Sequence, residues 1–172
     1  MARASLELVR ALDATATLVA SSTTYKWSSF GQCNCGHLAQ VITGLGGAAI
    51  QRAAFGGSGD WGAQAREVHL RRTVHRAAED EPEIERCAVT GRTMDEIVAA
   101  LFAAGLDHDD LGHLERLSDP RVLSRIGGAT LTHHRREDVV RYLRAFADLL
   151  RAELPPRRDL PDRDEDLPLA AE

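Results

Sequence analysis

A chain of 172 residues with 44% hydrophobic and 27% charged residues has the composition of a soluble globular protein, and it can bury a core without disulfide bonds or a structural metal. Its formal net charge of −5 argues against nucleic acid or an anionic membrane as a partner. No apolar run is long enough to span a membrane, and Glu7, Arg10 and Asp13 interrupt the first apolar stretch, so no signal peptide is expected. An odd number of cysteines, three, therefore predicts reduced thiols and a cytoplasmic location.

Apolar residues recur at helical spacing along residues 1–154, and no stretch alternates as a β-strand does. The pattern predicts an all-α, single-domain bundle of about six to eight helices. The first helix is expected over 5–20, where a run of Ser and Thr residues ends it. Asn34 is a good N-cap for a second helix, which stops at the glycines of 44–47, and a short third helix covers 48–55.

Capping signals mark the helices that follow. Asp60 is the expected cap of a helix that starts at Trp61 and becomes strongly charged. Thr93 and Glu96 have the spacing of a capping box, which opens a helix that Gly105 ends. These signals predict two further helices with a charged segment between them.

The last third of the chain predicts three more helices. A short one is expected around 111–117 from its leucine spacing. Asp119 and Pro120 are an N-cap and a proline at the first helical position, and they open another short helix. The final helix covers about 135–154 and has a broad apolar stripe.

Two segments have charge patterns typical of solvated chain. Arginines at 66–76 are followed by an acidic run at 79–85, which predicts an exposed helix face and then a loop. Residues 155–172 begin with two prolines and carry three Arg against six Asp and Glu residues. They predict an acidic, disordered tail beyond the helical domain of residues 1–154.

One short stretch gathers most of the reactive side chains. Cys33, Cys35 and His37 alternate, so in an irregular loop all three could face one ion, and thiolate and imidazole are ligands that zinc accepts. Cys87 is the remaining cysteine and a candidate fourth ligand, together with other histidines of the chain: His69, His75 and His113. This first hypothesis is a transition-metal site, with zinc as the cofactor. If Asn34 caps a helix, however, Cys35 and His37 point to nearly opposite sides of it.

The second hypothesis is a nucleophilic thiol. With Asn34 as cap, Cys35 occupies the first helical position, where free N–H groups and the helix dipole favour a thiolate and could stabilise an oxyanion. The string Asn34-Cys-Gly-His-Leu38 is similar to the Asn-Cys-x-His-[Phe/Leu] motif of the papain-like acyltransferase and peptidase families. The resemblance implies that Cys35 is the nucleophile of a thiol enzyme for acyl transfer or hydrolysis. His133 and His134, placed before a helix, are the candidate general bases.

The third hypothesis gives the cysteines a structural role. Cys33 and Cys35 would be small apolar fillers at a tight junction between loop and helix, and Gly36 would permit close packing there. The chain would then be a non-catalytic protein-interaction module, with another protein or a second copy of itself as partner. The sequence leaves the three hypotheses open.

Longer motifs extend the similarity to most of the chain. Together they resemble a family of small, uncharacterised bacterial proteins, and the resemblance covers about residues 5–154. It implies an intracellular helical protein and implies no reaction or ligand. The motifs are Tyr25-x-Trp27, Cys33-Asn-Cys-Gly-x-Leu-Ala-Gln40, Gly59-Asp-Trp61, His113-Leu-Glu-Arg-Leu-Ser-Asp-Pro120 and Asp138-Val-Val-x-Tyr-Leu143.

Overall fold

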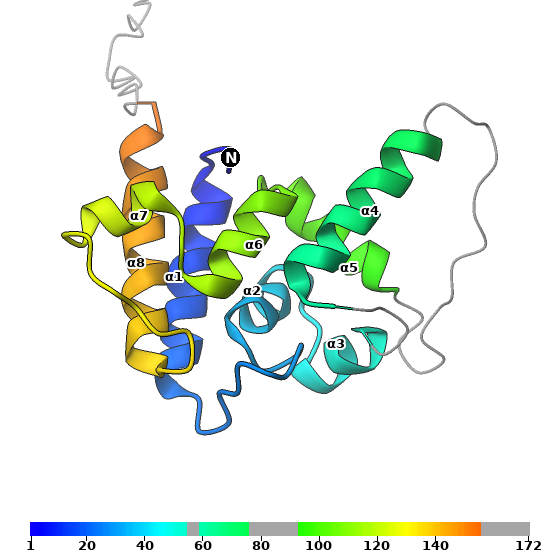
Figure 1. Ribbon diagram of the computed structural model, residues 1–172, viewed down its shortest axis with the longest axis horizontal. Coiled ribbons are helices and arrows are strands. Elements are labelled where there is room, and N and C mark those ends of the chain that lie inside the picture. Colours follow the sequence, from blue (N-terminus) through cyan, green and yellow to red (C-terminus); the bar gives the residue numbers. More distant parts are fainter. Residues whose placement is uncertain (55–58, 76–92, 156–172) are drawn as a thin grey trace, which may run out of the picture.

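A computed structural model describes residues 1–54, 59–75 and 93–155, and these residues form eight α-helices and no strand (Figure 1). The predicted all-α fold is confirmed. The charged segment at 76–92, which contains Cys87, and the predicted tail beyond residue 155 lie outside the described residues. The helices are α1 (Leu6–Ser21), α2 (Asn34–Thr43), α3 (Gly47–Ala53), α4 (Trp61–His75), α5 (Met94–Ala103), α6 (His108–Arg116), α7 (Pro120–Arg125) and α8 (Arg136–Glu153).

Most of these helices begin at or next to the capping residues that the sequence predicts. Asp60 accepts a hydrogen bond from the Ala63 amide at 2.7 Å and so caps α4. The Thr93 box is complete, with its hydroxyl and the Glu96 carboxylate each accepting from the other residue's amide. Asp119 caps α7 directly before its proline. These three predictions are confirmed.

The predicted N-cap of the second helix is wrong. Cys33 is the N-cap of α2, and its sulfur accepts a hydrogen bond from the Gly36 amide at 3.3 Å. Asn34 is already the first helical residue, and its side chain turns inward to donate to the Leu114 carbonyl at 2.5 Å. The Asn34 side chain therefore makes a long-range hydrogen bond to α6 instead of capping α2.

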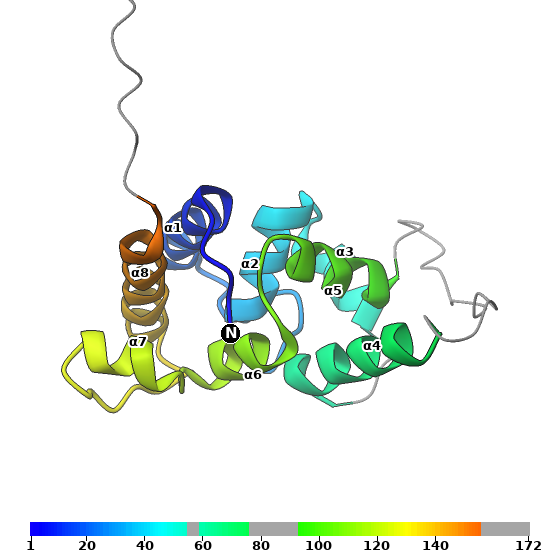
Figure 2. The same cartoon turned by 90° about the horizontal axis from the view of Figure 1, so that it is seen from above.

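Helices α2 and α6 lie at the centre of the molecule (Figures 1 and 2). On one side α1 packs along α8, with α7 against α8, and on the other α4 packs against α5 and α6. The first residues of α2, from Asn34 to Ala39, are buried in this arrangement. The predicted apolar stripes face the core, with fully buried leucines in α1 and α8: Leu8, Leu12, Leu143 and Leu150.

Candidate functional site

The cysteine stretch forms a buried junction between α2, α4 and α6. The backbone is tightly packed at Gly36, where an added Cβ would lie 2.1 Å from the Phe30 carbonyl oxygen. Only glycine lets the two backbones approach this closely. Gly31 makes a similar approach, because a Cβ there would lie 1.9 Å from the Gly47 carbonyl oxygen. The backbone of the junction is therefore fixed by two glycines, as the structural hypothesis expects of Gly36.

Asn34 ties the start of α2 to the end of α6. Its amide nitrogen donates to the carbonyls of Leu114 and Glu115, at 2.5 and 3.3 Å. The Trp27 indole N–H donates to the same Glu115 carbonyl at 3.4 Å. Carbonyls in the last turn of a helix lack their usual intrahelical partner. These side chains donate to the Glu115 carbonyl, and Asn34 is a second donor to the Leu114 carbonyl, which also accepts from the Leu117 amide at 3.3 Å. Asn34 thus has a structural partner in α6.

Burial keeps both cysteines protonated. Cys35 is fully buried, and its thiol donates to the Leu111 carbonyl at 3.7 Å. Burial raises the pKa of Cys35 well above 9.0, and the neighbouring Cys33 and Glu115 raise it further. Burial likewise raises the pKa of Cys33 to about 11, although the Gly36 amide lowers it in part. The helix N-terminus that would favour a thiolate is present, but loss of solvation is the larger effect.

Neither histidine proposed as general base contacts Cys35. The rings of His133 and His134 pack on Trp27, with centroids 4.3 and 4.9 Å from the indole. The Tyr25 hydroxyl donates to the His133 carbonyl at 2.6 Å and holds this loop against the junction. Among the described residues, no histidine hydrogen-bonds to the Cys35 thiol. The thiol-enzyme hypothesis stays a prediction, and this geometry gives it no general base.

His37 is buried and has a defined tautomer. Its Nδ1 lies 2.8 Å from the Cys33 carbonyl oxygen, which can only accept, so Nδ1 carries a proton, and in the neutral tautomer the lone pair is on Nε2. Such a nitrogen can bind a metal. Within the described part of the chain, however, the ligand atoms of Cys33, Cys35 and His37 do not all three lie within 4.8 Å of one another. Cys87 lies outside that part, so the predicted set of four stays a prediction.

The described histidines that were candidate fourth ligands do not lie at the cysteine stretch. The His113 Nδ1 lies 2.9 Å from the Ser118 hydroxyl, near the C-terminus of α6. The His69 ring stacks on His108 with centroids 4.8 Å apart. The side chain of His75 is outside the described residues. The structure therefore brings neither His69 nor His113 to the cysteine stretch.

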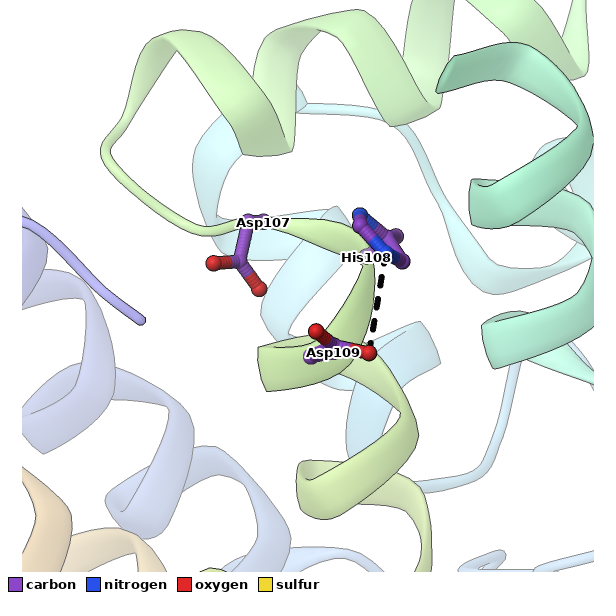
Figure 3. A group of neighbouring side chains, drawn as sticks. All are labelled: Asp107, His108 and Asp109. Atoms are coloured by element: carbon purple, nitrogen blue, oxygen red, sulfur yellow. Dashed lines mark ion pairs between the residues drawn. The ribbon is translucent and has the colours of Figure 1, made fainter. Parts of the chain in front are cut away.

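A different group of possible ligands occurs at the start of α6. Asp107, His108 and Asp109 bring one ligand atom each within 4.8 Å of the others, and Figure 3 shows them around the first turn. Asp107 is the N-cap: it accepts from the Asp110 amide at 2.8 Å and also pairs with the N-terminal ammonium of Met1. A helix N-terminus favours anions over cations. We therefore assign Asp107 to helix capping, and Asp109 is an acidic residue of the first turn, where the helix dipole favours it.

Glu115 is a buried carboxylate that sequence reasoning missed. Its oxygens accept from the backbone amides of Trp61 and Gly62, at 3.2 and 3.4 Å, so it caps α4 from α6. Burial raises the pKa of Glu115 above its ordinary value, and the nearby Asp60 adds to this. No local signal could have found it, because its partners lie more than fifty positions away in the sequence.

The pH dependence of the free energy of unfolding tests whether the pKa of Glu115 is raised in the folded protein. The folded state binds the Glu115 proton more tightly than the unfolded state, so the group's favourable contribution is complete below the unfolded pKa and is lost as pH rises through the folded pKa. We expect Glu115→Gln to gain stability relative to wild type as pH is raised from about 4 to about 7. Urea unfolding across this range measures the difference. The exposed Glu7→Gln is the control, and a wild-type–Glu115→Gln difference independent of pH would contradict the assignment.

A groove of about 410 Å³ lies between the C-terminal end of α7 and α8. The α8 residues that line it recur at steps of three and four, so they form one stripe roughly 16 Å long. The floor includes partly buried or buried apolar side chains, and three arginines stand around it. The lining residues are Arg125, Ile126, Glu137, Val140, Arg141, Arg144, Ala145 and Asp148.

The charges of this groove are unequally paired. Arg141 donates to the Ile126 carbonyl at 3.2 Å and so joins α8 to the end of α7. The two acids pair with arginines outside the groove: Glu137 with Arg136, and Asp148 with Arg151. Arg125 and Arg144 have no hydrogen bond or ion pair with any described residue. The groove therefore presents two guanidinium groups without a partner among the described residues, beside an apolar floor.

No protein-family model, curated protein or solved structure matches this chain. Among the described helices, none combines the length and apolar character that crossing a bilayer requires. The case for a function therefore rests on the geometry of the junction and of the groove.

Proposed function

We propose that this protein is a non-catalytic interaction module in which Cys33 and Cys35 are structural. Its binding surface is the groove between α7 and α8, and the partner is an acidic peptide segment that carries an apolar side chain. The observation that most supports this is that Arg125 and Arg144, beside the apolar floor, have no partner in the part of the chain that the structure describes.

The burial of the cysteine stretch supports the non-catalytic part of the proposal. A nucleophile or a catalytic metal must be reached by substrate, whereas Cys35 is fully buried and Cys33 is 2% exposed. Both thiols have raised pKa values, so neither is a ready nucleophile at neutral pH. The same residues make identifiable structural contacts with α6 and with the first turn of α2.

The shape and charge of the groove support an acidic peptide as partner. Guanidinium groups bind carboxylates in a planar, two-bonded geometry. A stripe of roughly 16 Å matches about five residues of extended chain. The apolar floor, which includes Val140 and Ala145, can take a leucine side chain from such a segment.

The proposal predicts that binding depends on Arg125 and Arg144. The probe is a fluorescein-labelled Asp-Asp-Leu-Asp-Asp peptide with blocked ends, titrated into the full chain to millimolar concentration at low ionic strength. We expect Arg125→Ala/Arg144→Ala to bind about two- to thirtyfold more weakly, because each of the two exposed ion pairs contributes roughly 0.2–1 kcal/mol. Fluorescence anisotropy measures the affinity.

The controls separate site binding from general attraction. Arg10→Ala/Arg72→Ala removes the same charge from two exposed arginines on α1 and α4, and it should change the affinity by less than about twofold. Replacing the peptide's leucine with serine should weaken binding, and replacing its acids with lysines should abolish it. Equal losses in both double variants, or no binding at millimolar peptide, would overturn the proposal.

A further inference from the structure

The chain carries a segment with the chemistry that the groove is proposed to bind. Residues 159–168 contain the sequence Asp-Leu-Pro twice, at 159–161 and at 166–168. Asp162, Arg163, Asp164 and Glu165 lie between the two copies, so acidic side chains outnumber the one arginine in the segment. Each copy places a carboxylate next to a leucine, and proline reduces the conformational entropy lost on binding. The segment therefore matches the guanidinium groups and the apolar floor of the α7–α8 groove.

The connectivity allows this segment to reach the groove. Helix α8 lines the groove and ends at Glu153, so Arg144 lies about 14 Å back along the helix from that end. An extended chain from Glu153 spans roughly 20 Å to Asp159 and roughly 40 Å to Asp166. The first copy can just return to Arg144, and the second can do so with slack. A short tether of this kind gives an effective concentration in the millimolar range.

We infer that residues 159–168 occupy the α7–α8 groove of their own chain and compete there with an external acidic peptide. The inference rests on the proposed function, because it assigns a second occupant to the same site. The tail then competes with external partners for the groove through weak, salt-sensitive contacts. An external partner must bind with enough affinity to displace the tethered tail.

The test uses full-length protein with substitutions in the segment. In one variant both copies are altered by Asp159→Asn, Leu160→Ser, Asp166→Asn and Leu167→Ser. The control variant, Ala170→Ser/Ala171→Ser, alters the same tail outside the two copies. The labelled Asp-Asp-Leu-Asp-Asp peptide should bind the first variant about five- to tenfold more tightly than wild type, because the tethered competitor is lost. It should bind the control as it binds wild type.

NMR gives a second, direct readout without any added peptide. Backbone amide signals of 137–148 should shift between wild type and the altered variant, and the same signals should stay in place in the control. Equal peptide affinity for all three chains, with unchanged signals, would overturn the inference. If the peptide affinity still depended on Arg125 and Arg144 in that case, the groove would still be the peptide site, and only its occupation by the tail would be rejected. A tail effect that grows with protein concentration would mean that the tail binds a second copy, which also overturns occupation within one chain.

Discussion

Replacing Gly36 with alanine should lower the free energy of unfolding by about 3 kcal/mol or more. An added Cβ would lie 2.1 Å from the Phe30 carbonyl oxygen and 2.8 Å from the Gly31 carbonyl carbon. Both are backbone atoms, so no flexible side chain can turn away. Alanine has the better helix propensity by about 1 kcal/mol, and the clash must exceed this gain.

The matched control for this substitution is Gly46→Ala. Gly46 precedes α3 with φ near −73°, which alanine adopts readily, and an added Cβ there meets no atom within 4 Å. Urea or thermal unfolding should show a change below about 1 kcal/mol for Gly46→Ala. Similar stabilities for the two variants would mean that the close approach at the cysteine junction is absent.

Truncating Trp61 should cost about 3–5 kcal/mol, the range typical of a buried large aromatic. Trp61 is 1% exposed at the first position of α4, and its ring lies 5.5 Å from the Phe30 ring. The cavity would open between α4 and the loop that precedes α2. Denaturant unfolding of Trp61→Ala measures the loss.

Trp61→Phe separates packing from the indole N–H. Phenylalanine keeps an aromatic ring beside Phe30 and removes a polar group that is buried without an oxygen or nitrogen acceptor among the described residues. We expect it to recover more than half of the stability lost in Trp61→Ala, because most of that loss is packing. If Trp61→Phe were as unstable as Trp61→Ala, the stabilisation by Trp61 would come from the indole N–H and not from packing of the ring.

Local signals predicted the helices well because capping is decided within a few residues. Thr93 with Glu96, and Asp119 with Pro120, supply both donor and acceptor within one turn. The apolar stripes of α1 and α8 were equally readable, since each buries one continuous face. The all-α fold could therefore be predicted without knowing how the helices pack.

The cysteine junction was harder to predict because distant residues decide it. Asn34 is a residue type that often caps helices, but its side chain donates to the buried Leu114 carbonyl. The Cys33 sulfur therefore caps α2 instead. That shift of one position places Cys35 in the second helical position, facing Leu111. The sequence shows which residues are chemically suited to a site, whereas burial between α2, α4 and α6 determines their pKa values.

The groove could not be predicted at all from local patterns. Arg125 and Arg144 lie on different helices, and nothing near either residue in the sequence indicates that both would lack a partner. The pairing of Glu137 and Asp148 with arginines outside the groove depends on side-chain packing along α8. Unpaired charge of this kind is visible only once α7 is placed against α8.

If Cys33 and Cys35 are structural, both thiols should resist alkylation in the folded protein. The full chain is labelled at neutral pH with iodoacetamide, with and without a metal chelator, and each cysteine is quantified by mass spectrometry. With a pKa of about 11 against an ordinary value of 9.0, Cys33 should label roughly 100-fold more slowly than in urea, and Cys35 at least as slowly. The chelator should change neither rate. Rapid labelling of Cys35 would instead support a nucleophile, and labelling released by the chelator would support a metal site.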